Sequence, residues 1–283
     1  MAGYSNDAPT ILRKILDRKL EEVAAYKAKV SLDEIKAHAA QANIDNPTRG
    51  FVNAITSRVA NKQPAVIAEI KKGSPSKGII RPNFDVASIA ESYERHGAAC
   101  LSCLTDEPFF FGCDADLATA RSSASLPVLR KDFIIDAFQI YESFELGADC
   151  ILLIVSALTD EALDEFYALA TGLGLDVLVE VHDASECQRA LRFAPKLLGI
   201  NNRNLHDFSV SLDTTLGLLE QIPSETLIIT ESGIHTESDV QSMWTSGVGT
   251  FLVGEAFMRH PDPGERLNAL FGSVQKPSTS KRD

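Results

Sequence analysis

The fold is decided by the stretch Val66-Ile67-Ala68-Glu69-Ile70-Lys71-Lys72-Gly73-Ser74-Pro75-Ser76-Lys77-Gly78. It opens as a short apolar run typical of a buried strand and then breaks into glycine, serine and proline. Because side chains alternate along a strand, Glu69 and Lys71 point to the same side of it. Charges that face a core are costly, so the pattern indicates a strand that ends at a polar pocket. Taken alone, it also fits a structural Glu/Lys pair beneath a loop.

The pattern of this first strand recurs along the chain. Short apolar runs alternate with amphipathic segments at starts spaced by roughly 20 to 35 residues, over a span of about 205 residues. We expect strands at residues 66–71, 100–105, 127–131, 150–155, 176–181, 197–201, 226–230 and 250–254. We expect helices at residues 85–96, 114–124, 136–146, 159–172, 184–193, 212–221, 236–246 and 264–271. Eight such units favour an α/β fold, a closed (β/α)8 TIM barrel. An open doubly wound sheet would usually have fewer units and a G-x-G-x-x-G motif in its first turn.

A helical extension precedes the predicted barrel. Residues 10–29 carry apolar side chains at helical spacing, so one face of this segment must cover something. Ser31 and Glu34 have the spacing of a capping box, which predicts a second helix ending before the turn-rich residues 43–47. We expect a single domain, 1–283, with an N-terminal helical extension (1–62), a barrel (66–272) and a polar tail (274–283) that is disordered.

Composition limits the class of protein and its partners. The net charge of -12 argues against a nucleic-acid surface and requires a local basic site for any anionic substrate. There is no apolar run of 18 residues and no signal-peptide pattern at the start, so no membrane or secretion role is expected. Of the five cysteines, Cys100 and Cys103 share one predicted strand without a second metal-ligand pair, which favours buried thiols and a reducing cytoplasm. A monomer and a weak homo-oligomer both remain open.

Polar residues end seven of the eight predicted strands. This matters because active sites in this fold lie at the C-terminal ends of the strands. The polar ends are Glu69, Lys71 and Ser74; the loop 104–113; Arg130, Lys131 and Asp132; Glu180; Asn201 and Arg203; Glu231 and Ser232; and Gly254 and Glu255. A carboxylate such as Glu180 within Val and Leu neighbours is destabilising unless it has a partner or a function.

Each of these signals also has a structural explanation. Lys131 could be a surface lysine, and Arg203 could close a loop through an ion pair. His182 fits a hydrogen-bonded structural residue better than a base. Gly233 and Gly254 could be turn glycines, although glycines that open short helices in the last two units of a barrel commonly cradle a phosphate. The coincidence of so many polar ends favours an active site.

The motifs that carry these residues resemble those of the indole-3-glycerol phosphate synthase family. The resemblance covers about residues 10–272, and its most specific part is the segment 67–76. It is supported by Leu129-Arg-Lys-Asp-Phe133, Leu178-Val-Glu-Val-His182, Ile200-Asn-Asn-Arg203, Glu231-Ser-Gly-Ile234 and Leu252-Val-Gly-Glu255. It implies ring closure, decarboxylation and dehydration of 1-(2-carboxyphenylamino)-1-deoxyribulose 5-phosphate, a small phosphorylated substrate, with no metal or organic cofactor. It also implies that the N-terminal helix lies over the barrel mouth.

The resemblance assigns catalytic roles to five residues. Lys131 is the general acid that protonates the ribulose carbonyl during ring closure. Glu180 is the general base of the dehydration, and we expect its apolar setting to raise its pKa. Glu69 and Asn201 hold the substrate hydroxyls and the base in place. Lys71 binds anionic groups and assists catalysis, and which lysine acts as the acid in each step remains open.

The remaining matches are substrate-binding residues. Arg203, helped by Ser74, binds the anthranilate carboxylate through its planar guanidinium. The other residues match as follows: Glu231 as part of the binding motif, Ser232, Gly233, Gly254 and the backbone of Glu255 as the phosphate seat, Phe110 and Phe133 as the wall around the anthranilate ring, and Leu252 as its apolar floor.

Two departures and two competing hypotheses accompany the resemblance. Cys113 stands where a hydroxyl residue is expected, and Phe111 makes that loop unusually apolar, which puts the loop's mobility in doubt. No second barrel follows in the sequence, so a monofunctional form is expected. A phosphoribosylanthranilate isomerase type would need a thiol on the first strand, where none is found. A catalytically inactive barrel used as a binding module would not need Lys71, Lys131, Glu180 and Asn201 together.

Overall fold

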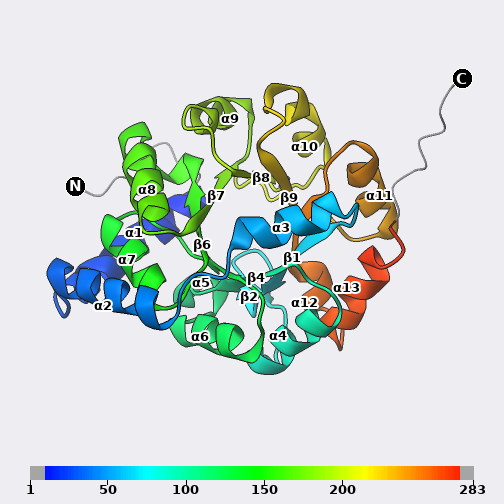
Figure 1. The fold of residues 1–283 in the computed structure, drawn as a ribbon. Coiled ribbons are helices and arrows are strands. Elements are labelled where there is room, and N and C mark those ends of the chain that lie inside the picture. The colour runs from blue at the N-terminus through cyan, green and yellow to red at the C-terminus, as the bar shows by residue number, and fades with distance from the viewer. Residues whose placement is uncertain (1–9, 275–283) are drawn as a thin grey trace, which may run out of the picture.

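Eight parallel strands close into a barrel in the computed structural model, which describes residues 10–274 (Figure 1). In their order around the barrel the strands are β1 (Ala65–Ile70), β10 (Thr250–Val253), β9 (Leu227–Glu231), β8 (Leu197–Asn201), β7 (Asp176–Val181), β6 (Cys150–Ile154), β5 (Val128–Lys131) and β4 (Cys100–Leu104), which pairs with β1. Each lies within one residue of its predicted bounds, and the prediction of a closed (β/α)8 barrel is confirmed.

Helices surround the barrel and bury both the strands and their own apolar faces. After the strands come α4 (Val86–Arg95), α6 (Asp114–Ser123), α7 (Ala137–Glu145), α8 (Asp160–Gly172), α9 (Ala184–Leu191), α10 (Asp213–Leu218) with a 3-10 turn (Leu219–Gln221), α11 (Glu237–Thr245) and α13 (Pro263–Phe271). Side chains such as Asp85, Thr159 and Thr236 cap their first turns by accepting backbone N–H bonds. β1, β4 and β6 are buried along their whole length, as expected of strands covered on both faces.

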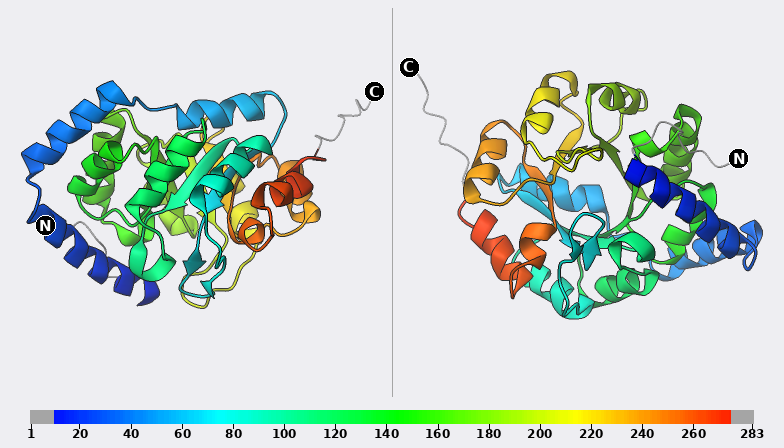
Figure 2. Two further views of the ribbon diagram at one scale, coloured as in Figure 1. Left: turned by 90° about the horizontal axis from the view of Figure 1, so that it is seen from below. Right: turned by 180° about the vertical axis from the view of Figure 1, so that it is seen from behind.

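From Thr10 onward, three helices precede β1: α1 (Thr10–Lys27), α2 (Leu32–Asp45) and α3 (Phe51–Ala60). The capping box of Ser31 and Glu34 at the start of α2 is confirmed. α3 was not predicted; it buries Phe51 and Ile55 completely. α1 and α3 lie at opposite ends of the barrel (Figure 2), so the extension contacts both ends.

Short elements that the sequence did not predict gather at the mouth of the barrel. The strand pair β2 (Gly73–Ser74) and β3 (Gly78–Ile79) forms a small hairpin after β1, a 3-10 turn (Val155–Ala157) follows β6, and two four-residue helices, α5 (Glu107–Phe110) and α12 (Glu255–Met258), follow β4 and β10. They shorten the path from each strand to its outer helix and bring loop residues over the barrel opening.

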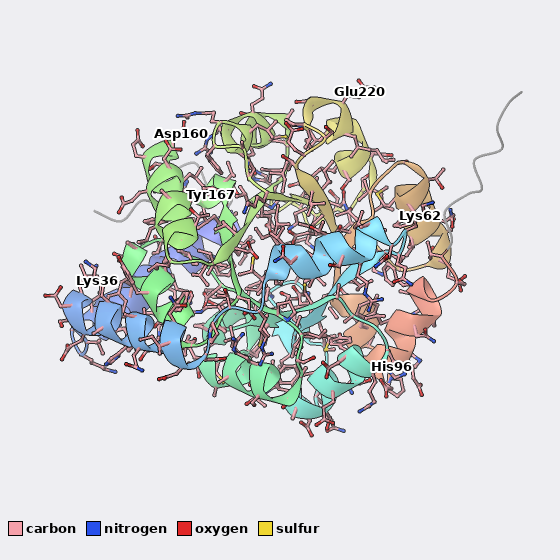
Figure 3. The ribbon with its side chains drawn as sticks, viewed as in Figure 1. Lys36, Lys62, His96, Asp160, Tyr167 and Glu220 are labelled. Atoms are coloured by element: carbon pink, nitrogen blue, oxygen red, sulfur yellow. The ribbon has the colours of Figure 1, made fainter. Side chains whose placement is uncertain are left out.

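The outer surface is charged and the interior apolar. Lys36, Lys62 and Glu220 are exposed on the outside of the helical ring (Figure 3). The thiols of Cys100, Cys103, Cys150 and Cys187 are free and buried, which confirms that expectation, and Cys113 is exposed. Within residues 10–274, no helix has the length and apolar character needed to cross a membrane. The predicted disordered tail lies, apart from Val274, outside the described residues.

Candidate active site

A cavity of about 180 Å³ opens at the C-terminal ends of the barrel strands. Every residue predicted for the site lines it: Glu69, Lys71, Ser74, Phe110, Lys131, Phe133, Glu180, Asn201, Arg203, Glu231, Ser232, Gly233, Leu252, Gly254 and Glu255. The residues come from seven strand ends and are up to 186 positions apart in sequence, from Glu69 to Glu255. The barrel therefore brings the whole predicted set to one place.

Glu69 and Lys71 form an ion pair at the end of β1. The Lys71 Nζ lies 2.6 Å from Glu69 Oε1, as expected from their alternation on the strand. Gly254 packs directly against this carboxylate, because a Cβ at that position would overlap Glu69 Oε1. Glycine is thus required at position 254 because its backbone lies so close to the Glu69 carboxylate.

Lys131 bridges two buried carboxylates. Its Nζ lies 3.0 Å from Glu180 Oε2 and 3.3 Å from Glu231 Oε2, and the carboxylate side chains are only 4% and 3% exposed. β5, β7 and β9 supply the three residues, so the contacts exist only when the barrel is closed. A buried ammonium between two carboxylates can both deliver a proton and stabilise negative charge.

The two carboxylates have opposite pKa shifts. Burial alone would raise the pKa of Glu180, as we expected from the sequence, but the neighbouring Lys131 and His182 hold it well below its usual range. That expectation was wrong because the sequence did not show that Lys131 and His182 both contact Glu180. Burial, together with nearby Glu180 and Glu69, raises the pKa of Glu231 to about 8 despite Lys131. Burial would lower the pKa of Lys131, but the surrounding carboxylates raise it. These shifts favour an ionised Glu180, a protonated Glu231 and a charged Lys131 at neutral pH.

Asn201 is fixed in one orientation beside Glu180. Its Nδ2 donates to Glu180 Oε1 at 3.2 Å, while its Oδ1 accepts from Ser232 Oγ and from the backbone N–H of Arg203, each at 3.0 Å. Both of these donors need the Asn201 Oδ1 as their acceptor, so a 180° flip of the amide group would lose both hydrogen bonds. Asn201 therefore links Glu180 to the residues that follow β8 and β9.

Arg203 and the turns that follow β9 and β10 also line the cavity. Arg203 Nη2 lies 3.7 Å from Glu255 Oε2, and Glu255 also pairs with Arg259 at 2.8 Å. The loop-closing ion pair considered for Arg203 is therefore present, although the guanidinium still lines the cavity. Ser232 and Gly233 follow each other with φ angles of 64° and 86°, which turns the backbone sharply after β9.

Aromatic and aliphatic side chains form the apolar walls. The rings of Phe110 and Phe133 have centroids 5.8 Å apart and an interplanar angle of 37°. Sequence analysis missed further lining residues, namely Ile11, Leu12 and Ile15 on α1, Leu152 and Ile154 on β6, and Leu205 and Phe208 after β8. The apolar end of β6, the one strand without a polar end, was a signal for a wall facing the substrate ring.

A buried ion-pair cluster joins α1 to the mouth. Lys19 Nζ lies 2.9 Å from Asp132 Oδ1, 3.3 Å from Asp106 Oδ2 and 2.7 Å from Glu22 Oε2. Asp132 lies between Lys131 and Phe133, and Asp106 caps α5 by accepting the backbone N–H of Phe109. α1 is thus anchored to the two segments that hold the aromatic wall, in agreement with the expectation that this helix lies over the mouth.

In the part of the chain from Thr10 to Val274, no group of three or more His, Cys, Asp or Glu side chains is arranged to hold a metal ion. The polar groups at the mouth are organised around ion pairs and amide contacts. They can provide an acid, a base and sites for anions.

A family model described as indole-3-glycerol phosphate synthase matches residues 12–270. Among solved structures, the chain is similar to a 3-hexulose-6-phosphate synthase from Salmonella typhimurium, with 13% identity, a TM-score of 0.59, and coverage of 74% of this chain and 97% of that one. It is also similar to a tryptophan synthase subunit alpha from Legionella pneumophila, with 15% identity, a TM-score of 0.58, and coverage of 78% and 97%. At these identities the two structures support the fold alone.

Proposed function

We propose a division of roles among the mouth residues of this chain, which belongs to the indole-3-glycerol phosphate synthase family. Its reaction is the ring closure, decarboxylation and dehydration of 1-(2-carboxyphenylamino)-1-deoxyribulose 5-phosphate to indole-3-glycerol phosphate, carbon dioxide and water. The chain is therefore a carboxy-lyase of tryptophan biosynthesis, and it acts on a small phosphorylated substrate.

Lys131 is the proposed acid of ring closure. As the aryl carbon attacks the ribulose carbonyl, the carbonyl oxygen gains electron density and must be protonated. Lys131 is charged, buried and directed into the cavity, so it supplies both a proton and a positive charge at that oxygen. The buried bridge of Lys131 to Glu180 and Glu231 is the observation that carries this proposal.

Glu180 is the proposed base of the dehydration. Lys131 and His182 lower its pKa and keep it ionised at neutral pH, so its oxygens carry no proton before the reaction, and the loss of the Lys131 proton during ring closure then makes Glu180 a stronger base. Asn201 orients it through the bond to Oε1. Once decarboxylation has restored the aromatic ring, loss of the hydroxyl needs a proton donor and loss of the proton needs Glu180. Lys71, held by Glu69, is placed to assist with the hydroxyl.

The two anionic groups of the substrate are assigned to different residues of the cavity. We assign the anthranilate carboxylate to Arg203 and Ser74, with the substrate replacing part of the 3.7 Å contact between Arg203 and Glu255. We assign the phosphate to the backbone at Ser232, Gly233, Gly254 and Glu255, and the aromatic ring to the space beside Phe110, Phe133 and Leu252. The side-chain carboxylate of Glu255 would repel the phosphate, so we assign only the backbone N–H of Glu255 to phosphate binding.

We also infer a cytoplasmic location, which the free buried cysteines support. The oligomeric state is left as either a monomer or a weak homo-oligomer. We further infer that the helical extension and the barrel form one domain, supported by the contacts of α1 and α3 with opposite ends of the barrel.

The roles of Lys131 and Glu180 are tested by the Lys131→Met and Glu180→Gln variants. We expect each to lower kcat by about 10² to 10⁴, since each removes one partner of acid–base catalysis. Formation of the fluorescent indole product from synthetic substrate measures the rate. Matched surface variants, Lys36→Met and Glu220→Gln, should keep wild-type turnover because both residues are exposed on the outer helices. Wild-type turnover in both active-site variants would contradict the assignment.

A further inference from the structure

His182 lies directly behind the proposed base. It follows the last residue of β7, and its Nε2 lies 3.3 Å from Glu180 Oε1, in ion-pair contact without hydrogen-bond alignment. Its Nδ1 lies 3.0 Å from Glu186 Oε2 on α9, and the same oxygen accepts the backbone N–H of His182 at 2.9 Å. The ring is therefore held at both nitrogens between two carboxylates.

This arrangement gives Glu180 a cation on each oxygen. Lys131 contacts Oε2, and His182 contacts Oε1, which also accepts the Asn201 amide. Burial would lower the pKa of His182, but Glu180 and Glu186 raise it to about 10. The imidazole is consequently an imidazolium over the range in which enzymes of the cytoplasm operate.

Other charged groups surround this centre on all sides. Beyond Glu180 lie Lys131 on β5 and Glu231 on β9, whose raised pKa leaves it neutral until about pH 8. Behind His182 is a second cavity of about 280 Å³, which is also lined by Asp183, Glu186, Arg203 and His206. Of these neighbours, Glu180 and Glu186 are the ones in direct contact with the imidazole.

The proposed ring closure removes one of the two cations. A carbon–carbon bond forms as the carbonyl π bond breaks, and the carbonyl oxygen takes a proton from Lys131, which becomes a neutral amine. Glu180 then loses the charge of its nearest partner, and a buried carboxylate without a counter-charge tends to take up a proton. A protonated Glu180 could not act as the base of the later dehydration.

We propose that His182 is a positioning residue that keeps Glu180 ionised while Lys131 is without its proton. His182 transfers no proton and touches no reacting atom; it acts through Glu180, with Glu186 holding the ring in place. The inference rests on the proposed roles of Lys131 and Glu180. It explains why a charged pair, Glu186 and His182, lies behind a base that already has a lysine beside it.

The protonation state of His182 can be measured in the resting enzyme. In protein labelled with ¹⁵N and ¹³C histidine, we expect the His182 ring to stay protonated to about pH 9 by NMR, and the His182→Gln spectrum assigns its signals. The Glu180→Gln variant should lower the pKa at which His182 titrates. Titration of His182 near its ordinary value in the wild type would overturn the inference, whether or not the His182→Gln variant folds.

Kinetics then test the effect on the base. In His182→Gln we expect kcat to fall about tenfold or more between pH 8 and pH 6, because Glu180 becomes protonated during turnover, while the wild type changes little over that range. The charge-preserving variant His182→Lys should recover part of the loss at pH 6, and KM should change less than kcat. A purely structural role would lower kcat equally at all pH values, and that result would overturn the inference.

The two variants distinguish the role of His182 from that of Glu180. An inactive Glu180→Gln together with a wild-type pH profile in His182→Gln would remove the role of His182 and leave Glu180 as the base. An active Glu180→Gln would instead remove the proposed base itself.

Discussion

At the scale of single residues, the site gives two chemically identical side chains different pKa values. Glu180 and Glu231 face the same ammonium, yet Glu180 stays ionised and the pKa of Glu231 is raised to about 8. The difference arises because Glu180 has a second cation and an amide donor, whereas Glu231 Oε1 is buried without a hydrogen-bond partner among the described residues. Pairs whose pKa values are driven apart are typical of acid–base sites.

The raised pKa of Glu231 predicts how substrate binding depends on pH. As pH rises through about 8, Glu231 loses its proton and adds a negative charge to a cavity that must hold a phosphate and a carboxylate. We therefore expect KM to rise on the alkaline side in the wild type. The neutral Glu231→Gln variant should lack this rise, and steady-state kinetics from pH 6 to 9.5 would show it. The same alkaline rise in the variant would assign it to another group.

At the scale of secondary-structure elements, the sequence correctly predicted the helices and strands that have a strong hydrophobic periodicity and clear end signals. All eight barrel strands are apolar runs bounded by turns, and the polar residues at their ends identified the site before any geometry was known. α3 was missed because β-branched residues and a preceding turn obscure its period, although Phe51 and Ile55 do have helical spacing. β2, β3, α5 and α12 were missed because elements of two to four residues have no period and depend on tertiary contacts.

Contacts between elements could not be predicted from the sequence either. Lys19 is one of several basic residues on α1, and nothing in its spacing shows that it is buried against Asp106 and Asp132 from two separate loops. The prediction that the pKa of Glu180 is raised was wrong for the same reason. The identity of its neighbours, rather than its own apolar strand, decides the sign.

The anchoring of α1 leads to a prediction at this scale. Lys19→Met leaves Asp106 and Asp132 buried with one cation fewer, so we expect the free energy of unfolding to fall by about 3 kcal/mol. We also expect a higher KM, since the loops that carry Phe110 and Phe133 lose their anchor. Denaturant unfolding and steady-state kinetics measure the two effects. Lys14→Met, which changes an exposed lysine of the same helix, is the matched control and should leave both unchanged.

At the scale of the whole molecule, Asp149 ties the extension to the barrel. This fully buried carboxylate accepts the backbone N–H of Arg49 at 2.6 Å, the Arg121 guanidinium at 2.6 Å and the backbone N–H of Val128 at 2.7 Å. Arg121 in turn donates to Asn46 Oδ1 at 2.9 Å, just before α3. Asp149 therefore connects the segment before α3 to the start of β5 and, through its own position, to the start of β6.

If the extension and barrel are one domain, this residue affects the stability of both. We expect Asp149→Asn to lower the free energy of unfolding by about 3–5 kcal/mol, because Arg121 is left as a buried cation without its carboxylate. Unfolding should remain a single transition, seen at the same urea concentration by Trp244 fluorescence and by far-UV circular dichroism. Asp33→Ala on exposed α2 is the control. Two separate transitions in the wild type would show that the extension unfolds independently.

All five cysteines lie in the described part of the chain. Cys113 is exposed, whereas the other four are buried. It follows Gly112, in the same loop as Phe110 and Phe111, at the start of α6. Because partial burial raises the pKa of its thiol, a thiol-reactive dye at mildly alkaline pH would attach at this position without any engineered substitution. The label would show whether the loop between β4 and α6 moves as substrate enters and product leaves.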